Sequence, residues 1–240
     1  MKIIIVKNSE EFGKAAFNEV YKVVKNNPSA TLGLATGSTP LPLYAEMVKD
    51  HRDRGTSYKD VRTFNLDEYV GLPASHKESY VNFMTRNLFS KIDVDMKNVN
   101  IPCGTAENVD EECARYSALL QNAVVDIQVL GIGGNGHIAF NEPGTPFDSV
   151  THRVWLTEKT ISDNSRFFGH IDEVPKSAIT MGIGEIMRAK KILMLASGKN
   201  KADAVFRMIS GKVDKSCPAS VLQLHPSVTV ILDKEAASKL

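Results

Sequence analysis

The residues best suited to chemistry in this chain follow a glycine-rich turn near its middle. Residues 131–144 read Gly-Ile-Gly-Gly-Asn-Gly-His-Ile-Ala-Phe-Asn-Glu-Pro-Gly, and the largely apolar segment before them, 125–130, predicts a buried strand. Ligands of open parallel α/β sheets bind beyond the carboxyl ends of the strands, which is where His137 and Glu142 would lie. A side chain that titrates near neutral pH, close to a carboxylate, indicates proton transfer.

The same glycines also resemble a nucleotide-binding motif. Gly131, Gly133 and Gly136 fit the G-x-G-x-x-G pattern of dinucleotide-binding proteins, in which they open a long helix that holds the pyrophosphate. Here Pro143 and Gly144 arrive almost at once and would interrupt such a helix. The sequence therefore argues against a nucleotide site.

A second candidate site lies where a predicted strand, 30–35, meets a helix expected from Pro40. The intervening Thr36-Gly37-Ser38-Thr39 would place backbone N–H groups, hydroxyls and the positive end of a helix dipole around an anion. A plain capped helix start explains the same residues, because Ser and Thr are favoured there. The loop has no P-loop lysine, which argues against a nucleoside triphosphate.

Two carboxylates, Asp67 and Glu68, follow a third predicted strand, 61–66. Successive side chains of an extended chain point in opposite directions, so at most one of the two is expected to face a substrate. The alternative is that they are turn residues that help to cap a helix. The residues alone leave both interpretations open.

Two basic residues are candidates for binding an anion. Lys201 falls in the first turn of a helix predicted after the strand 191–195, where a cation is unfavourable unless an anion joins it. Arg166 precedes two phenylalanines and is either a surface residue or a phosphate clamp. The isolated histidines are expected to be surface or structural residues: His51, His76, His152 and His170.

Strands and helices alternate along the chain, so we predict an α/β fold, three-layer and doubly wound around a mainly parallel sheet. Residues 1–240 contain no repeat, linker or low-complexity segment and are expected to form a single domain. A helix is predicted over 79–88, with these residues in the core: Tyr80, Phe83, Met84 and Leu88. Because the candidate groups follow strands, we expect one shared site at the carboxyl edge of the sheet.

Composition excludes several classes of function. A net charge of +1 gives no global attraction to nucleic acid or to acidic membranes. Three scattered cysteines are too few for a disulfide framework or a zinc site and are typical of the reducing cytosol. The apolar run within residues 1–7 is too short for a signal peptide or a membrane span. We therefore expect a cytoplasmic protein with no nucleic-acid or membrane partner.

Four motifs, in this order, resemble those of the glucosamine-6-phosphate deaminase family over essentially the whole chain. They occupy residues 34–40, 65–72, 136–143 and 164–168 and read LATGSTP, NLDEYVGL, GHIAFNEP and NSRFF. The resemblance implies a Rossmann-like fold of the NagB/RpiA-like kind. It also implies that the substrate is a small sugar phosphate: glucosamine 6-phosphate would become fructose 6-phosphate and ammonia, in amino-sugar catabolism, with no redox cofactor and no metal.

The resemblance further implies a role for each candidate residue. Asp67 would take the C2 proton and return it to C1, and with an ordinary pKa of about 3.9 it would be ionised at neutral pH. His137 would open the pyranose ring by moving a proton from the anomeric hydroxyl to the ring oxygen. Glu142 and Asn135 would orient its imidazole, as the second members of catalytic triads do. These residues would bind the 6-phosphate: Gly37, Ser38, Thr39, Arg166 and Lys201.

Two departures from the family pattern matter. Some members carry Asp where this chain has Asn135, which supplies no charge, so Glu142 is expected to have a larger role in stabilising His137. The C-terminus is short, as in the smaller members, so we expect a monomer rather than the hexamer activated by N-acetylglucosamine 6-phosphate. The alternatives are a 6-phosphogluconolactonase, which needs no C2 base, and a non-catalytic sugar-phosphate sensor, which needs no catalytic set.

Overall fold

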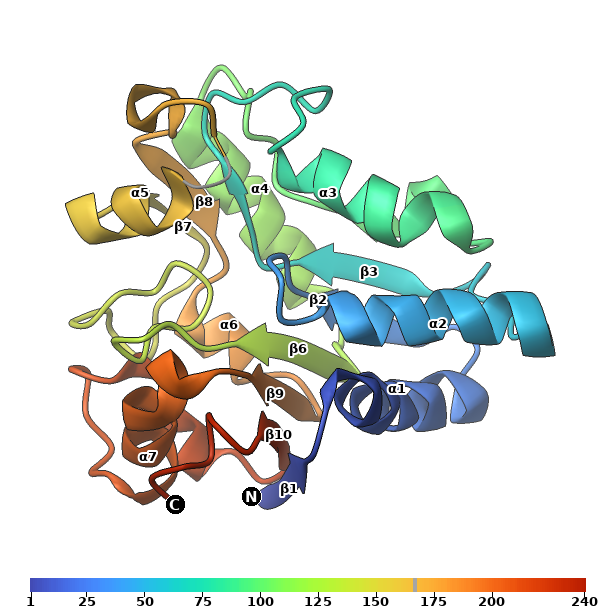
Figure 1. The fold of residues 1–240 in the computed structure, drawn as a ribbon. Helices are drawn as coiled ribbons and strands as arrows, with labels where there is room; N and C mark the ends of the chain where they lie inside the picture. Colours follow the sequence, from blue (N-terminus) through green and yellow to red (C-terminus); the bar gives the residue numbers. More distant parts are fainter. Residues whose placement is uncertain (166–167) are drawn as a thin grey trace.

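The computed structural model describes residues 1–165 and 168–240. Its centre is a seven-stranded parallel sheet in the order β1-β10-β9-β6-β2-β3-β5 (Figure 1). The strands are β1 (Lys2–Val6), β2 (Thr31–Leu34), β3 (Arg62–Asn65), β5 (Val99–Asn100), β6 (Ile127–Gly131), β9 (Ile192–Ala196) and β10 (Val228–Asp233). The predicted α/β fold with a mainly parallel sheet is confirmed.

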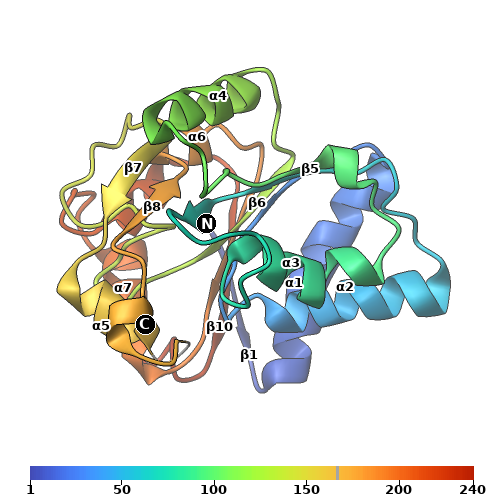
Figure 2. The same cartoon turned by 90° about the horizontal axis from the view of Figure 1, so that it is seen from above.

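Helices cover both faces of this sheet, as Figure 2 shows. On one side lie α1 (Ser9–Asn26), α2 (Leu41–Arg54) and α3 (Tyr80–Asn87), and on the other α4 (Val109–Gln121), α6 (Ile183–Ile186) and α7 (Ala202–Ser210). The short 3-10 helices are η1 (Phe89–Lys91), η2 (Met96–Asn98), η3 (Ile171–Glu173), η4 (Lys199–Lys201) and η5 (Pro218–Leu224). Among the described residues, none of the helices is both long enough and apolar enough to cross a membrane.

The sheet is enclosed because its central strands are apolar at nearly every position. All residues of β2 and of β9 are buried, which is typical of parallel strands covered by helices. Helix α1 packs one apolar stripe inward, since Phe12, Ala16 and Val20 recur at intervals of one helical turn. Because the strands are parallel, the turns after β2, β3, β6 and β9 meet at one edge of the sheet.

A second, three-stranded antiparallel sheet was not predicted. It pairs β4 (Asp67–Tyr69) with β8 (Ser177–Thr180), and β8 with β7 (His152–Trp155), which α5 (Glu158–Ser165) follows. The segment with Asp67 and Glu68 is therefore a strand, and not the turn that one of the two sequence interpretations proposed. A strand as short as β4 shows no alternating pattern, and its partner is distant in the sequence.

The glycine-rich stretch after β6 does not open a helix. Residues 132–151, which connect β6 to β7, form turns, irregular structure and one isolated β-bridge between Ile138 and Asn141. A dinucleotide-binding motif needs a helix at this position to hold the pyrophosphate. The glycines after β6 are therefore not followed by the helix that a dinucleotide-binding motif requires.

Candidate active site

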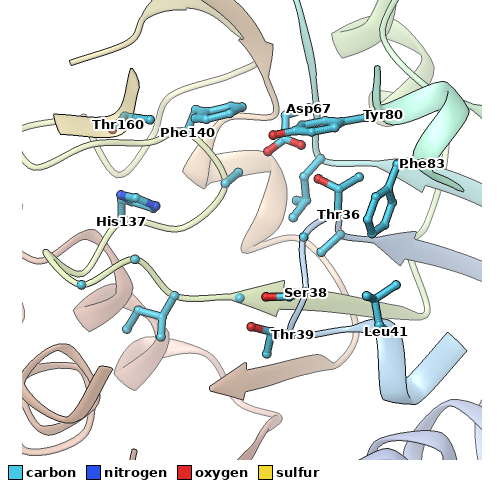
Figure 3. Close-up of a pocket in the computed structure, with 18 of the residues that line it drawn as sticks. Thr36, Ser38, Thr39, Leu41, Asp67, Tyr80, Phe83, His137, Phe140 and Thr160 are labelled. Carbon is cyan, nitrogen blue, oxygen red and sulfur yellow. The ribbon is translucent and has the colours of Figure 1, made fainter. Parts of the chain in front are cut away.

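A cleft of about 690 Å³ opens at the carboxyl edge of the central sheet. Its walls come from the turns after β2, β3, β6 and β9, from α3 and from β4. Figure 3 shows Ser38 and Thr39 on one side of the cleft, Asp67 on another and His137 on a third. The structure thus brings these predicted site residues together: Gly37, Ser38, Thr39, Asp67, His137 and Lys201.

The turn after β2 forms a backbone cradle at the start of α2. Gly37 has a φ of 95°, in the left-handed region that glycine adopts without strain. The N-cap residue of α2 is Pro40, and none of the described side chains caps this helix end. The interpretation of Ser38 and Thr39 as ordinary helix caps is therefore wrong. A helix start without a side-chain cap, together with the positive end of the helix dipole, suits an anion.

The turn after β9 adds a cation to the cleft. Lys201 is the N-cap residue of α7 and lines the cleft together with Ser197 and Asn200. A cation at the N-terminus of a helix is unfavourable by itself and becomes favourable when an anion binds there. The other basic residue predicted for the phosphate, Arg166, lies outside the described residues.

Asp67 is buried at the wall of the cleft, with 7% of the residue exposed. Burial, together with the neighbouring charge of Glu68, raises the pKa of Asp67 to about 8. The expectation that Asp67 is ionised at neutral pH, with an ordinary pKa, therefore does not hold for the free protein. A pKa close to the working pH suits a group that must both take up and release a proton.

Glu68 caps a helix and does not line the cleft. Its side chain is 2% exposed and accepts backbone N–H bonds from Tyr69 at 2.8 Å, Tyr80 at 3.0 Å and Val81 at 3.0 Å. Tyr80 and Val81 begin α3, where a carboxylate is favourable. Asp67 thus faces the cleft, as expected for a site residue, whereas Glu68 caps a helix, as the alternative interpretation proposed.

The imidazole of His137 lies against the backbone of Gly133. A Cβ at Gly133 would come within 2.3 Å of the ring, so only glycine leaves room for it. The Gly133 N–H also donates to the carbonyl oxygen of His137 at 2.9 Å. Ala139, close by, has a φ of 50°, a conformation that costs a non-glycine residue on the order of 1 kcal/mol and that is typical of functional sites.

Glu142 stands behind His137, where three groups converge on its carboxylate. Oε2 accepts from the Asn135 side-chain amide at 2.6 Å, and Oε1 accepts from the Thr160 hydroxyl at 2.8 Å. Nδ1 of His137 lies 3.5 Å from Oε1, and such catalytic contacts often shorten only when substrate binds. Burial raises the pKa of Glu142, but His137, Thr160 and Asn135 together lower it to about 2. Glu142 therefore stays ionised at neutral pH.

Asn135, which was predicted to orient the imidazole together with Glu142, is bonded to the Glu142 carboxylate and to the backbone of His137. Its amide nitrogen donates to Glu142, and its Oδ1 accepts the backbone N–H of His137 at 3.1 Å. The loop is also tied to β8: the Phe140 N–H donates to the Thr180 hydroxyl, and the buried Asn141 side chain donates to the Met181 carbonyl. Since Thr180 pairs with Asp67, β8 positions the loop and the buried carboxyl together.

Sequence reasoning missed several residues of the cleft. Tyr80 and Phe83 of α3 were predicted for the core, yet both are half-buried and line the cleft; Met84 and Leu88 are buried, as predicted. Helical spacing finds the inward face of a helix but does not say whether that face meets the core or a cavity. Thr160 also lines the cleft, although no motif singled it out.

The sequence of this chain matches one family model over residues 7–231, described as glucosamine-6-phosphate isomerases/6-phosphogluconolactonase. The chain belongs to this family. A glucosamine-6-phosphate deaminase from Clostridium novyi is 51% identical over 241 residues, and one from Lactobacillus delbrueckii subsp. bulgaricus is 54% identical over 240 residues. Both alignments cover 100% of each chain. The four-motif resemblance to this family is confirmed.

Solved structures of similar proteins share the fold. A structure described as a monomeric glucosamine-6-phosphate deaminase of the NagB superfamily has a TM-score of 0.98 and 44% identity, and the match covers 100% of both chains. A 6-phosphogluconolactonase from Trypanosoma brucei has a TM-score of 0.81 at 22% identity, covering 100% of this chain and 98% of the other. At that identity the second match supports the fold alone.

Proposed function

We propose that this chain converts glucosamine 6-phosphate and water into fructose 6-phosphate and ammonia. One observation carries the proposal: a buried carboxyl group with a pKa of about 8, an imidazole backed by a carboxylate and an uncapped helix N-terminus all border one cleft. These groups supply a carbon base, a proton carrier and a phosphate cradle. Full-length relatives about 50% identical bear the name of this activity, which supports the same conclusion.

The 6-phosphate would bind at the cradle of Gly37, Ser38 and Thr39. Backbone N–H groups, two hydroxyls and the helix dipole favour a dianion there, and Lys201 adds charge. Arg166 is proposed as a further phosphate ligand on the resemblance alone. Anchoring the phosphate would place the sugar ring between Asp67 and His137, since these side chains border the rest of the cleft (Figure 3).

Ring opening needs a proton to leave the anomeric hydroxyl and to arrive at the ring oxygen. Nε2 of His137 would take this proton from the anomeric hydroxyl and deliver it to the ring oxygen, because a neutral imidazole that carries its hydrogen on Nδ1 has Nε2 free to accept one. Glu142 stays ionised, so it would hold Nδ1–H and stabilise the transient imidazolium without taking the proton. Asn135 would act indirectly, through Glu142, by fixing the orientation of its carboxylate.

Asp67 would then move the C2 proton of the open-chain aldehyde to C1. Removal of the C2 proton, with transfer of one ammonium proton to the aldehyde oxygen, gives an enolamine. Protonation at C1 then gives an imine at C2, which water hydrolyses to the ketone and ammonia. The ammonium group of the substrate would favour the ionised form of Asp67 in the complex, because an opposite charge nearby lowers the pKa of a carboxyl group. The buried acid would thus become a base on substrate binding.

The proposal is tested by incubating the protein with glucosamine 6-phosphate and EDTA and measuring both products. We expect ammonia and fructose 6-phosphate in equal amounts. Hydrolysis of 6-phosphogluconolactone with no release of ammonia would replace the proposal with the lactonase. Tight binding of glucosamine 6-phosphate without turnover of either compound would indicate the sensor.

We also propose that residues 1–240 act as one domain and as a monomer in the cytoplasm. The similar structure, at a TM-score of 0.98, is described as monomeric, which supports the monomer. Light scattering coupled to gel filtration should give a mass near 26.4 kDa at micromolar concentration. A mass that is a multiple of this value would refute the monomer.

A further inference from the structure

The hydroxyl of Thr160 bonds to Glu142, and nothing in the proposed reaction uses it. Thr160 lies in α5, is 8% exposed and lines the cleft. Its Oγ1 donates to Oε1 of Glu142 at 2.8 Å. This oxygen is also the one that faces Nδ1 of His137, at 3.5 Å. Thr160 therefore acts on the carboxylate oxygen that the imidazole needs.

The two carboxylate oxygens of Glu142 are held by two different parts of the chain. Asn135 fixes Oε2 from the loop before His137, and Thr160 fixes Oε1 from α5. A carboxylate held at one oxygen only can still rotate about its terminal bond, because that torsion is soft. With Thr160 in place, rotation would break a charge-assisted hydrogen bond, so Oε1 stays directed toward the imidazole.

Thr160 is itself oriented by Thr157. The backbone N–H of Thr160 donates to Oγ1 of Thr157 at 3.2 Å, and the two hydroxyl oxygens lie 3.0 Å apart. A hydroxyl has a single proton, and that of Thr160 goes to Glu142, so Thr157 must be the donor in the hydroxyl–hydroxyl contact. The result is a directed chain of donors from Thr157 through Thr160 to Glu142, and such chains strengthen each member bond.

We propose that Thr160 is a positioning residue for ring opening, whose hydroxyl holds the Glu142 carboxylate toward His137. The inference rests on the proposed function, because it concerns the same imidazole. It does not require Thr160 to touch the substrate. The Thr160 side chain could matter through its packing or through its hydroxyl group, and two substitutions distinguish these contributions.

Thr160→Val keeps the branched shape and removes the hydroxyl, whereas Thr160→Ser keeps the hydroxyl and removes a methyl group. We expect kcat for ammonia release to fall about tenfold in Thr160→Val and to stay within about threefold of wild type in Thr160→Ser. KM should change by less than about threefold in both variants, because the phosphate cradle is untouched. If Thr160→Val does not fold, as judged by circular dichroism, Thr160→Ala carries the same expectation.

Two results for kcat would overturn this inference without affecting the proposed function. An unchanged kcat in Thr160→Val would show that the hydroxyl is not needed. An equal fall in kcat in Thr160→Val and Thr160→Ser would show that packing matters and the hydroxyl does not. A rise in KM with no change in kcat would make Thr160 a binding residue instead. If wild type releases no ammonia in the same assay, the proposed function fails, so the two failures are distinguishable.

Discussion

Asp67→Asn should abolish ammonia release while making the folded protein more stable at pH 8. The substitution keeps the shape of the side chain but removes its ability to accept a proton from C2. General base catalysis contributes about 10²–10⁴-fold, so we expect kcat to fall by at least about a thousandfold. KM should change little, because Asp67 does not belong to the proposed phosphate cradle. Asp60→Asn, at an exposed site, is the matched control and should leave kcat unchanged.

The gain in stability follows from the raised pKa. Folding moves the pKa of Asp67 from about 4 in the unfolded chain to about 8. Between these values the folded protein keeps a proton that the unfolded chain has lost, so the free energy of unfolding falls as the pH rises through this window. Asn has no proton to lose and escapes this effect. The variant should therefore match wild type at pH 4 and exceed it at pH 8.

Each pKa unit corresponds to about 1.4 kcal/mol, and we expect a gain of about 2–3 kcal/mol at pH 8 after relaxation of the site. For a chain of this length that is roughly 5–10 °C in Tm. Scanning calorimetry of both proteins at pH 4 and pH 8 measures it. A Tm difference that is the same at both pH values would show that Asp67 is not held with a raised pKa, even if activity is lost.

The parallel sheet was predictable because each of its strands has a local signal. β9, for example, is an uninterrupted apolar run, and a Gly-containing turn follows it directly. Parallel strands end at one edge, so the positions of Asp67, His137 and Lys201 after three of the predicted strands were enough to bring them together. The types of these residues and their order along the chain were therefore sufficient to predict where the site lies.

The protonation of the site was not predictable, because it depends on distant parts of the chain. The pKa of Asp67 rises through burial, and this segment pairs with β8, which the local sequence does not indicate. The same limit applies to Asn135. The sequence places it two residues before His137, but only the folded loop shows that its amide reaches Glu142. Local patterns identify the groups, and long-range packing sets their proton affinities and partners.

His137→Asn should reduce kcat by about 10²–10⁴-fold, because Asn keeps a polar group near Glu142 but cannot transfer a proton between two oxygens. The substrate alcohol in open-chain form, glucosaminitol 6-phosphate, has no ring to open, so its Kd should stay within about threefold of wild type. His152→Asn, on β7 and away from the cleft, is the matched control. Equal losses in kcat and in affinity for the alcohol would make His137 a binding residue.

A double variant of His137 and Glu142 gives a sharper test of whether Glu142 acts through the imidazole. If Glu142 acts only through the imidazole, Glu142→Gln should slow the wild type but should cost nothing more once His137 is already Asn. Double-mutant cycles measure this coupling directly, and residues that act as one unit are strongly non-additive. We therefore expect the double variant to equal His137→Asn in kcat. A further loss in the double variant would mean that Glu142 contributes to the reaction on its own, for example by contacting the sugar, and that the chain from Thr160 through Glu142 to His137 is not the route by which it acts.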